Sequence, residues 1–573
     1  MIVVKKKWRM LIATLLCLAM VCSVLTISAF AKEEESKPGA DVLQESVLSN
    51  LLTTDLYVAK DKKSGLRSEV NVIVNIQHLS GTVYLPGCAQ VKKLRLAWDI
   101  DGLTLSRNNK TYKSGKAPIA PAGKSYTYTL SKDGLSANLK IRTLQGSEKV
   151  RPMFLELDES KGTFDAVNLD RDHETACYGV VKVGDHKKKY VRLKGRGNSS
   201  FRLLKKGYNL KTYDDGTYTS KDKTKLMKNV KTSKWSLLGS YFDNSMLRNK
   251  IALDLAKELG IGLDAELIDL WVDGNFLGNY TLTPKNDYDC PDGGYSLEFD
   301  NQPDENQFKL PHIMDTGLGD DHDVVTIRDI GKKAKAAGQT PKTIEKWFLK
   351  AWAACLDYTS EDYQKYFDVD SWAKMYLMYE LSKTYSSFSG SLFMHRDGLT
   401  KNDKLKAGPA WDFDIAFGRT LHKLGAIQDD RAQLTADSWY IDTIGFPGSE
   451  DPVNILQALG RHKSFMEAVR KVFNDNKKAF QGIDANITKQ KKILKQSAYM
   501  NNDFYGSNSL SAEYVFTPNT LAFLGTGKYK LDYHFTTTWE DYVYNLREYC
   551  NKRVLWLSDN LAPGVEIQTY TLG

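Results

Sequence analysis

The 573-residue chain is poor in cysteine and proline, with seven and 15 residues respectively. Two cysteines lie within the first 31 residues, and the other five are widely scattered. An odd, scattered set does not form a disulfide framework and leaves open at most one isolated bridge. No CxxC spacing indicates a zinc site, and the nine histidines form no HExxH or paired metal motif. The chain is therefore neither a disulfide-rich scaffold nor a zinc enzyme of a familiar type.

A strong excess of one charge is also missing. The chain has 79 basic and 70 acidic residues, which gives a net charge of +9. Residues 1–31 carry four positive charges and no acids, so the remaining 542 residues carry +5, the difference between 9 and 4. This bias is too weak to indicate a nucleic-acid partner. Long apolar runs are limited to the first 31 residues, so we expect no membrane contact by any later segment.

The N-terminal segment, residues 1–31, has the pattern of a signal peptide. Positive residues are followed by an apolar run from Met10, and Ala29-Phe30-Ala31 provides small residues for cleavage. An uncleaved membrane anchor is the alternative, because the apolar run approaches the length that spans a bilayer. Together with the composition, this segment predicts a secreted or cell-surface protein of a Gram-positive bacterium.

The sequence after the export segment predicts two folded regions. Residues 32–69 are expected to form a linker and lead-in, and residues 70–165 contain short alternating runs separated by turn residues. Regularly spaced short strands favour a small all-β, sandwich-like domain. We find no site in it and expect a role in adhesion or packing. The runs are Val70–Asn75, Thr82–Leu85, Leu94–Trp98, Tyr126–Leu130 and Ala137–Ile141.

Residues 170–562 form the second predicted region, and residues 563–573 form a tail. Strand patterns dominate its first part, including a hairpin around Asp273-Gly274-Asn275. Apolar residues at helical spacing predict an amphipathic helix over Ser245–Leu259. Residues Thr340–Lys383 are predicted to be mainly helical. The fold class of this region is therefore α+β, with sheet first and helix later.

Two carboxylates stand two residues apart in the segment Gly408–Gly418, GPAWDFDIAFG. In an extended chain, Asp412 and Asp414 face the same way and could enter one site. Burial of two acids together is costly unless a cation neutralises them. Hard oxygen ligands that leave room for water and phosphate suit Mg²⁺ or Mn²⁺. The alternative is a strand end whose acids cap a helix or pair with Arg419.

A basic segment some 200 residues upstream, Lys194–Lys211, offers groups that suit phosphate oxygens. The candidates in its loop are Arg196, Gly197, Asn198 and Ser199, and Lys211 follows on an alternating stretch. A solvated basic turn is the alternative for the loop, and Lys205 and Lys206 compete with Lys211 for the same role. A phosphate-binding lysine and metal-binding aspartates are the two halves of a phosphoryl-transfer site.

These segments resemble the CotH kinase family, secreted or spore-coat proteins with an atypical, divergent kinase-like fold. Six motifs occur in the family's order over residues 175–560: Lys194–Ser200, Lys205–Lys211, Lys234–Leu238, Asp243–Ile251, Leu270–Leu282 and Gly408–Gly418. The resemblance implies an atypical two-lobed protein-kinase-like domain after the β domain. It also implies transfer of the ATP γ-phosphate to Ser or Thr of coat, envelope or extracellular proteins.

The resemblance assigns roles to individual residues. Arg196–Ser200 would cover the nucleotide phosphates, and Lys211 would pair with them. Asp412 would be the catalytic metal ligand that bridges to the phosphates, with Asp414 as a second ligand. The implied cofactors are ATP and Mg²⁺ or Mn²⁺.

The catalytic base departs from the family pattern. The family places an acid near Thr384–Ser387, where this chain has none, and Pro284 replaces a common glutamate. His395-Arg396-Asp397 looks like a conventional kinase catalytic loop, but its flanks predict a β-hairpin strand away from the phosphates. The alternative to an active kinase is therefore a pseudokinase that serves as a nucleotide-binding or assembly scaffold. A third possibility is a carbohydrate-active protein, because the aromatic content suits sugar stacking and paired acids occur in glycosidases.

Overall fold

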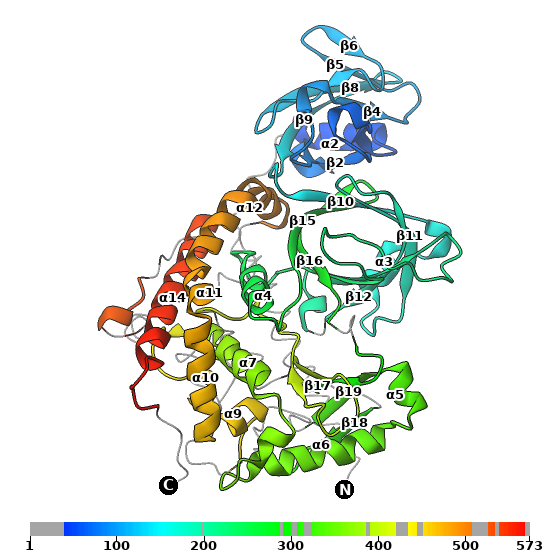
Figure 1. Cartoon of the computed structure of the whole chain (residues 1–573). Helices are drawn as coiled ribbons and strands as arrows, with labels where there is room; N and C mark the ends of the chain where they lie inside the picture. The colour runs from blue at the N-terminus through cyan, green and yellow to red at the C-terminus, as the bar shows by residue number, and fades with distance from the viewer. Residues whose placement is uncertain are drawn as a thin grey trace, which may run out of the picture.

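The computed structural model describes residues 39–197, 199–286, 290–300, 306–313, 324–384, 390–419, 434–443, 451–506, 525, 527–532, 534 and 538–567. Three parts follow one another from top to bottom in Figure 1: an N-terminal β domain, a β-barrel, and a mixed sheet with most of the helices. The predicted signal peptide, residues 1–31, lies outside the described residues. The mixed α+β class predicted from the sequence is confirmed.

The N-terminal β domain is a nine-stranded sheet in the order β6-β5-β8-β9-β3-β2-β1-β4-β7. All neighbours are antiparallel except β3 and β9. The predicted strand runs are confirmed, whereas part of the expected linker forms the helix α2, which buries Leu48 and Leu51. The elements are α2 (Gly39–Leu51), β1 (Leu56–Val58), β2 (Val70–Asn75), β3 (Ser80–Leu85), β4 (Arg95–Trp98), β5 (Thr104–Arg107), β6 (Lys110–Tyr112), β7 (Ala117–Pro118), β8 (Ser125–Lys132) and β9 (Leu135–Gln145).

The second part is a closed barrel in the order β10-β11-β12-β13-β14-β16-β15. Its parallel pair, β10 and β15, closes the ring. Alternate residues such as Leu193, Leu210 and Trp235 fill the interior, so the residues between them point outward. The elements are β10 (Arg151–Leu157), α3 (Phe164–Leu169), β11 (Ala176–Val183), β12 (Lys189–Arg196), β13 (Gly207–Tyr213), β14 (Lys234–Leu238), α4 (Arg248–Glu258), β15 (Glu266–Val272) and β16 (Asn275–Pro284).

The third part contains a five-stranded sheet in the order β18-β19-β17-β20-β21. Helices α12 and α14 lie side by side along one flank of the molecule, and α12 reaches up to the barrel. The elements are β17 (Tyr295–Asp300), β18 (Gln307–Lys309), β19 (Val324–Ile330), α5 (Lys332–Ala336), α6 (Pro341–Leu356), α7 (Val369–Ser382), β20 (Leu392–Arg396), β21 (Lys406–Ala407), α9 (Ile455–Gly460), α10 (Lys463–Asp475), α11 (Lys477–Gln481), α12 (Ile483–Tyr505) and α14 (Trp539–Asn560).

Two local predictions in this region can be compared directly with the structure. The His395-Arg396-Asp397 run does lie on a hairpin strand, since β20 pairs antiparallel with β21 at His395 and Lys406. Asp397 lies at the surface, where it forms an exposed ion pair with Lys406.

Among the helices that the structure describes, none combines the length and apolar character that a bilayer crossing requires.

Candidate active site

The segment with the two aspartates follows β21 and is held by the helix α4. The Asn249 side-chain oxygen accepts a hydrogen bond from the Phe413 backbone N–H at 2.9 Å. Arg248 Nε donates to the Ala416 carbonyl at 2.8 Å, and Phe417 N–H donates to the Ser382 carbonyl at 2.6 Å. Both α4 side chains are buried. The barrel-side helix therefore fixes the backbone on which the acids stand.

Helix α4 begins at Arg248, three residues later than predicted, because the preceding residues form a turn around Asp243. Asp243 is 1% exposed and accepts hydrogen bonds from the backbone N–H groups of Ser245 and Arg248 at 3.0 and 2.8 Å. It also forms an ion pair with the Arg248 guanidinium. Leu247 occupies the N-cap position, and the Asp243 carboxylate accepts from the first helical N–H group, that of Arg248.

The two predicted acids do come together. Asp414 forms a hydrogen bond with the Asp412 carboxyl, and burial, the Asp412 charge and Asp243 raise the pKa of Asp414 well above its usual value. Asp412 itself has a left-handed backbone, with φ of 67°, and its carbonyl accepts from the Thr384 hydroxyl at 3.2 Å. Non-glycine residues in this conformation are strained, and such strain concentrates at functional sites. The arrangement is a half-buried carboxylate pair that a cation would stabilise.

Arg196 faces this pair from the end of β12. Its guanidinium lies 5.5 Å from the centre of the Trp411 ring. Burial lowers the pKa of Arg196, while Asp412, Asp414 and Glu298 act in the opposite direction. Sequence reasoning placed Arg196 and the two aspartates in one site, and the structure brings these three residues together.

The rest of the predicted phosphate loop is partly described. Gly197 has φ of 99°, and a Cβ atom there would lie 2.3 Å from the Ser200 hydroxyl oxygen, so the turn requires glycine. The Gly197 carbonyl contacts His173 Nε2 at 2.7 Å. Asn198 and the side chain of Ser199 lie outside the described residues.

Lys211 lies on β13 with its side chain outside the barrel. Burial lowers the pKa of Lys211 to about 8, and its charged neighbours add to this effect because they are cations: Arg192, Lys221, Lys234 and Lys285. Lys211 is therefore not paired with the aspartates in the way that Arg196 is. Its predicted contact with nucleotide phosphates stays a prediction.

The two competing lysines have structural partners. Lys205 is 3% exposed, and its Nζ donates to the Asn501 side chain at 2.8 Å and to the Asn279 carbonyl. Burial lowers the pKa of Lys205 to about 7, although Asp269 and Asp243 oppose this shift. Lys206 Nζ donates to the backbone carbonyl of Phe201 at 2.5 Å. Lys205 thus ties the barrel to α12.

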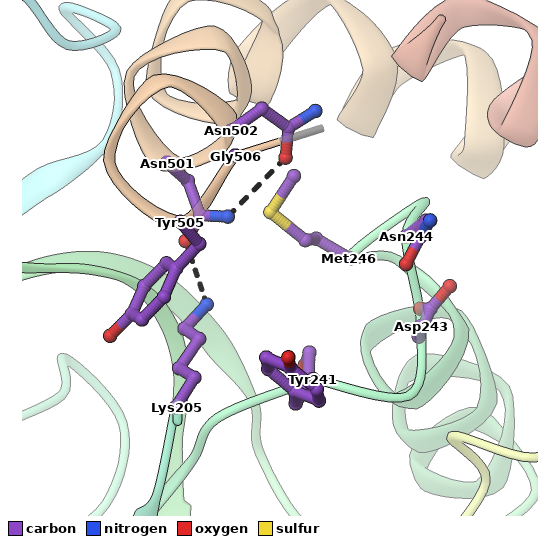
Figure 2. Close-up of a pocket in the computed structure, with 10 residues that line it drawn as sticks. Lys205, Tyr241, Asp243, Asn244, Met246, Asn501, Asn502, Tyr505 and Gly506 are labelled. Atoms are coloured by element: carbon purple, nitrogen blue, oxygen red, sulfur yellow. Dashed lines mark hydrogen bonds between the residues drawn. The ribbon is translucent and has the colours of Figure 1, made fainter. Parts of the chain in front are cut away.

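A small cleft opens between Lys205, the turn before α4 and the end of α12 (Figure 2). Asp243 lies on its wall, and its charge also raises the pKa of Asp414. The lining residues are Lys205, Ser240, Tyr241, Asp243, Asn244, Met246, Asn501, Asn502, Tyr505 and Gly506.

Sequence reasoning missed one further acid near the carboxylate pair, Glu298 on β17. It is 6% exposed, forms an ion pair with Arg328 at 3.2 Å, and acts electrostatically on Arg196 and Tyr379. Because its neighbours Leu297 and Phe299 enter the core, Glu298 points to the opposite side of the sheet. An acid inside a short alternating strand was the signal available in the sequence. Residues 385–389, where the family acid is expected, lie outside the described residues.

The donor set around Asp412 fits a divalent cation only in part. Within the described residues no group of three or more His, Cys, Asp or Glu side chains is placed to hold a metal ion. Asp412 and Asp414 supply two hard oxygen donors, which is the usual protein share of a Mg²⁺ site completed by water and substrate phosphate. The pair therefore suits a metal that arrives with a nucleotide.

Comparison with protein families matches residues 193–557, more than half of the chain, to the CotH kinase protein family. The chain belongs to the CotH kinase protein family. The match spans the barrel from β12 onward, α4, the Asp412–Asp414 segment and α14. A search of curated proteins found no match. Membership of this CotH family implies an atypical protein kinase, with ATP as phosphate donor and protein as acceptor.

Proposed function

We propose that this CotH kinase is an exported enzyme that transfers the ATP γ-phosphate to Ser or Thr residues of coat, envelope or extracellular proteins. The observation that carries the proposal is the half-buried Asp412–Asp414 pair, held by α4 and near Arg196. Phosphoryl transfer depends mainly on positioning and charge neutralisation, which such a site supplies. The signal-peptide pattern of residues 1–31 supports export.

Each group has a role in this proposal. Asp412 and Asp414 would hold Mg²⁺ or Mn²⁺, which supplies positive charge to the nucleotide phosphates. Arg196 and the turn at Gly197 would contact phosphate oxygens from the barrel side, and Lys211 remains the predicted nucleotide lysine. The Asn249 side chain accepts from the Phe413 N–H and so fixes the backbone between the two acids.

Glu298 is our proposed replacement for the missing base. The charge of its carboxylate acts on both Arg196 and Tyr379. The charge of Asp412 acts on the same two residues, so Glu298 belongs to the same charged cluster as Asp412. Arg328 forms an ion pair with this carboxylate at 3.2 Å. A pseudokinase scaffold is the alternative, and it is favoured by the absence of an acid in Thr384–Ser387.

The test is phosphotransfer from γ-labelled ATP by the purified chain with Mg²⁺ or Mn²⁺. We expect Asp412→Asn to abolish incorporation, and Asp397→Asn, the kinase-like aspartate on the exposed hairpin, to leave it unchanged. Glu298→Gln should lower kcat by about 10²–10⁴-fold, the usual contribution of a general base, without weakening ATP binding. No incorporation by wild type with either metal, together with retained ATP binding, would establish the pseudokinase.

A further inference from the structure

The positive charge of the chain is concentrated in the N-terminal β domain. Strands β2 to β9, residues 70–145, contain 11 basic and three acidic residues and therefore carry a net charge of +8. Residues 146–573 contain 58 basic and 59 acidic residues, a net charge of −1. Such an asymmetry between two parts of one chain indicates that the basic part meets an anionic partner.

The excess is greatest over residues 102–132, which contain six cations and no acid. This stretch forms β5, β6, β7 and β8. Figure 1 shows β5 and β6 at the end of the domain that is farthest from the barrel, whereas β2 contacts the barrel strand β16. Four of the six cations lie on the β5–β6 hairpin and the connection that follows it, and we call them the distal basic patch: Arg107, Lys110, Lys113 and Lys116.

The connection between β6 and β7, which carries Lys113 and Lys116, is held in place by β4. The Gly115 backbone N–H donates to the Leu96 carbonyl of β4 at 3.0 Å. The connection also closes a turn of its own, because the Lys116 N–H donates to the Lys113 carbonyl at 3.1 Å. Both lysine side chains are exposed. The patch is therefore displayed from a fixed backbone.

No acid neutralises the distal basic patch within the part of the chain that the structure describes. Its four side chains form no ion pair or side-chain hydrogen bond there, and two of them lie over tyrosine rings instead. Arg107 is 3.6 Å from the ring centre of Tyr126, and Lys110 is 5.3 Å from that of Tyr112. Arg107 also lies directly opposite Lys110 in the β5–β6 pair, where like charges repel. A bound anion would relieve this repulsion.

Protection of the sheet edge accounts for only part of this charge. Strand β6 is the last strand of the sheet, and lysines on such edges hinder pairing with other chains. This role explains Lys110 on β6. It does not explain Lys113 and Lys116, which lie outside the strands.

The form of the patch favours a linear polymer with many charges. A small anion would meet only one or two cations of a patch that extends over two strands and a connection, whereas a polymer with an anion on each repeat would meet all four. Single-stranded nucleic acids also stack their bases on open aromatic faces. Here Tyr112 and Tyr126 pack against the domain core and carry a patch cation over the ring. The patch thus offers charge without stacking platforms, which favours an anionic polysaccharide.

We propose that the distal basic patch binds a linear anionic polysaccharide outside the cell and so tethers the CotH kinase to it. The predicted signal peptide would bring the domain to such polymers. Because the patch lies at the far end of the β domain, a bound polymer leaves the Asp412–Asp414 site open. The proposal does not depend on phosphotransfer and holds equally for a pseudokinase scaffold.

The test is biolayer interferometry of the full purified chain on immobilised polygalacturonate, a carboxylate polysaccharide, and on neutral dextran. We expect binding to polygalacturonate alone, with affinity falling as salt rises. Lys110→Gln/Lys113→Gln/Lys116→Gln should weaken binding about tenfold, as expected for the loss of three exposed ion pairs. The corresponding triple arginine variant keeps the charge and should bind like wild type.

Lys342→Gln/Lys346→Gln/Lys350→Gln, at exposed positions of α6, is the matched control. It removes the same charge and should bind like wild type. All of these changes are at the surface, so the melting temperatures should stay close to that of wild type. No binding of polygalacturonate by wild type, equal binding of dextran, or equal weakening by the patch and α6 variants would overturn the proposal. Tighter binding of a single-stranded DNA oligonucleotide than of polygalacturonate would overturn the choice of a polysaccharide.

Discussion

The Arg553→Met substitution is expected to destabilise the third part of the molecule strongly. Arg553 on α14 and Glu380 on α7 are both 0% exposed, and Arg553 Nη2 lies 2.8 Å from the Glu380 carboxylate. The guanidinium also donates to the carbonyls of Glu380 and Ser438 at 3.0 and 2.7 Å. Methionine would fill the space of the side chain but supply none of these donors. Glu380 would then be a buried charge without its cation.

The magnitude follows from this geometry. Removing one partner of a buried ion pair lowers the free energy of unfolding by about 3–5 kcal/mol. Glu380 keeps two backbone donors, the N–H groups of Tyr440 and Ile441 at 2.9 and 2.8 Å, so the lower end of this range is expected. Arg547, on the same helix, pairs with Asp484 at the surface, where both side chains are about one third to one half exposed. Arg547→Met is therefore the control, with a loss of about 0–1 kcal/mol.

The pH dependence gives a second check. Burial raises the pKa of Glu380 in the folded protein, and Arg553 opposes this shift. Without Arg553 the folded pKa rises further above the unfolded value of about 4.3. A raised carboxyl pKa leaves stability intact below the unfolded pKa and removes it as pH rises through the folded pKa. The loss in Arg553→Met should therefore shrink between pH 7 and pH 5. Urea unfolding followed by circular dichroism measures it, and a loss that is pH-independent or no larger than in Arg547→Met would refute the reasoning.

Two further substitutions test other parts of the account. Asn249→Ala leaves the Phe413 N–H unsatisfied at a buried position. It should raise the KM for Mg–ATP in addition to lowering the melting temperature, and an unchanged KM would argue against a role of Asn249 in positioning the acids. Lys205 has a folded pKa lowered to about 7, so its contribution to stability is present above pH 10.4 and is lost as pH falls toward 7. Lys205→Met should therefore lack the decline in unfolding free energy that wild type shows between pH 10 and 7, and a parallel decline in both proteins would be inconsistent with a buried titrating lysine.

Local patterns in the sequence predicted the elements that depend on local chemistry. Alternating apolar residues marked the strands of the N-terminal domain, and Asp273-Gly274 marked the turn between β15 and β16. Asp412 and Asp414 come together as predicted, but not through the extended backbone that the prediction assumed, because Asp412 has a left-handed φ of 67°. The His395–Asp397 strand was separated from a kinase catalytic loop by the strand pattern of its flanks.

Other features depend on the tertiary arrangement and left little signal in the sequence. Glu298 joins Arg196 only because β17 faces the barrel, and Asp243 reaches Asp414 only because α4 clamps the acidic segment. The late start of α4 follows from the turn that contains Met246, a residue with a left-handed φ of 57°. The cations around Lys211 are brought together by strand register, which no single segment encodes.

Metal-dependent nucleotide binding tests the central claim most directly. Calorimetric titration of wild type, Asp412→Asn and Asp397→Asn with a non-hydrolysable ATP analogue, each with and without Mn²⁺, isolates the part of the affinity that depends on the metal. The account predicts that Mn²⁺ strengthens binding by wild type and by Asp397→Asn, and that this gain disappears in Asp412→Asn. The same metal-dependent gain in Asp412→Asn would contradict the assignment of the Asp412–Asp414 pair as the metal–nucleotide site.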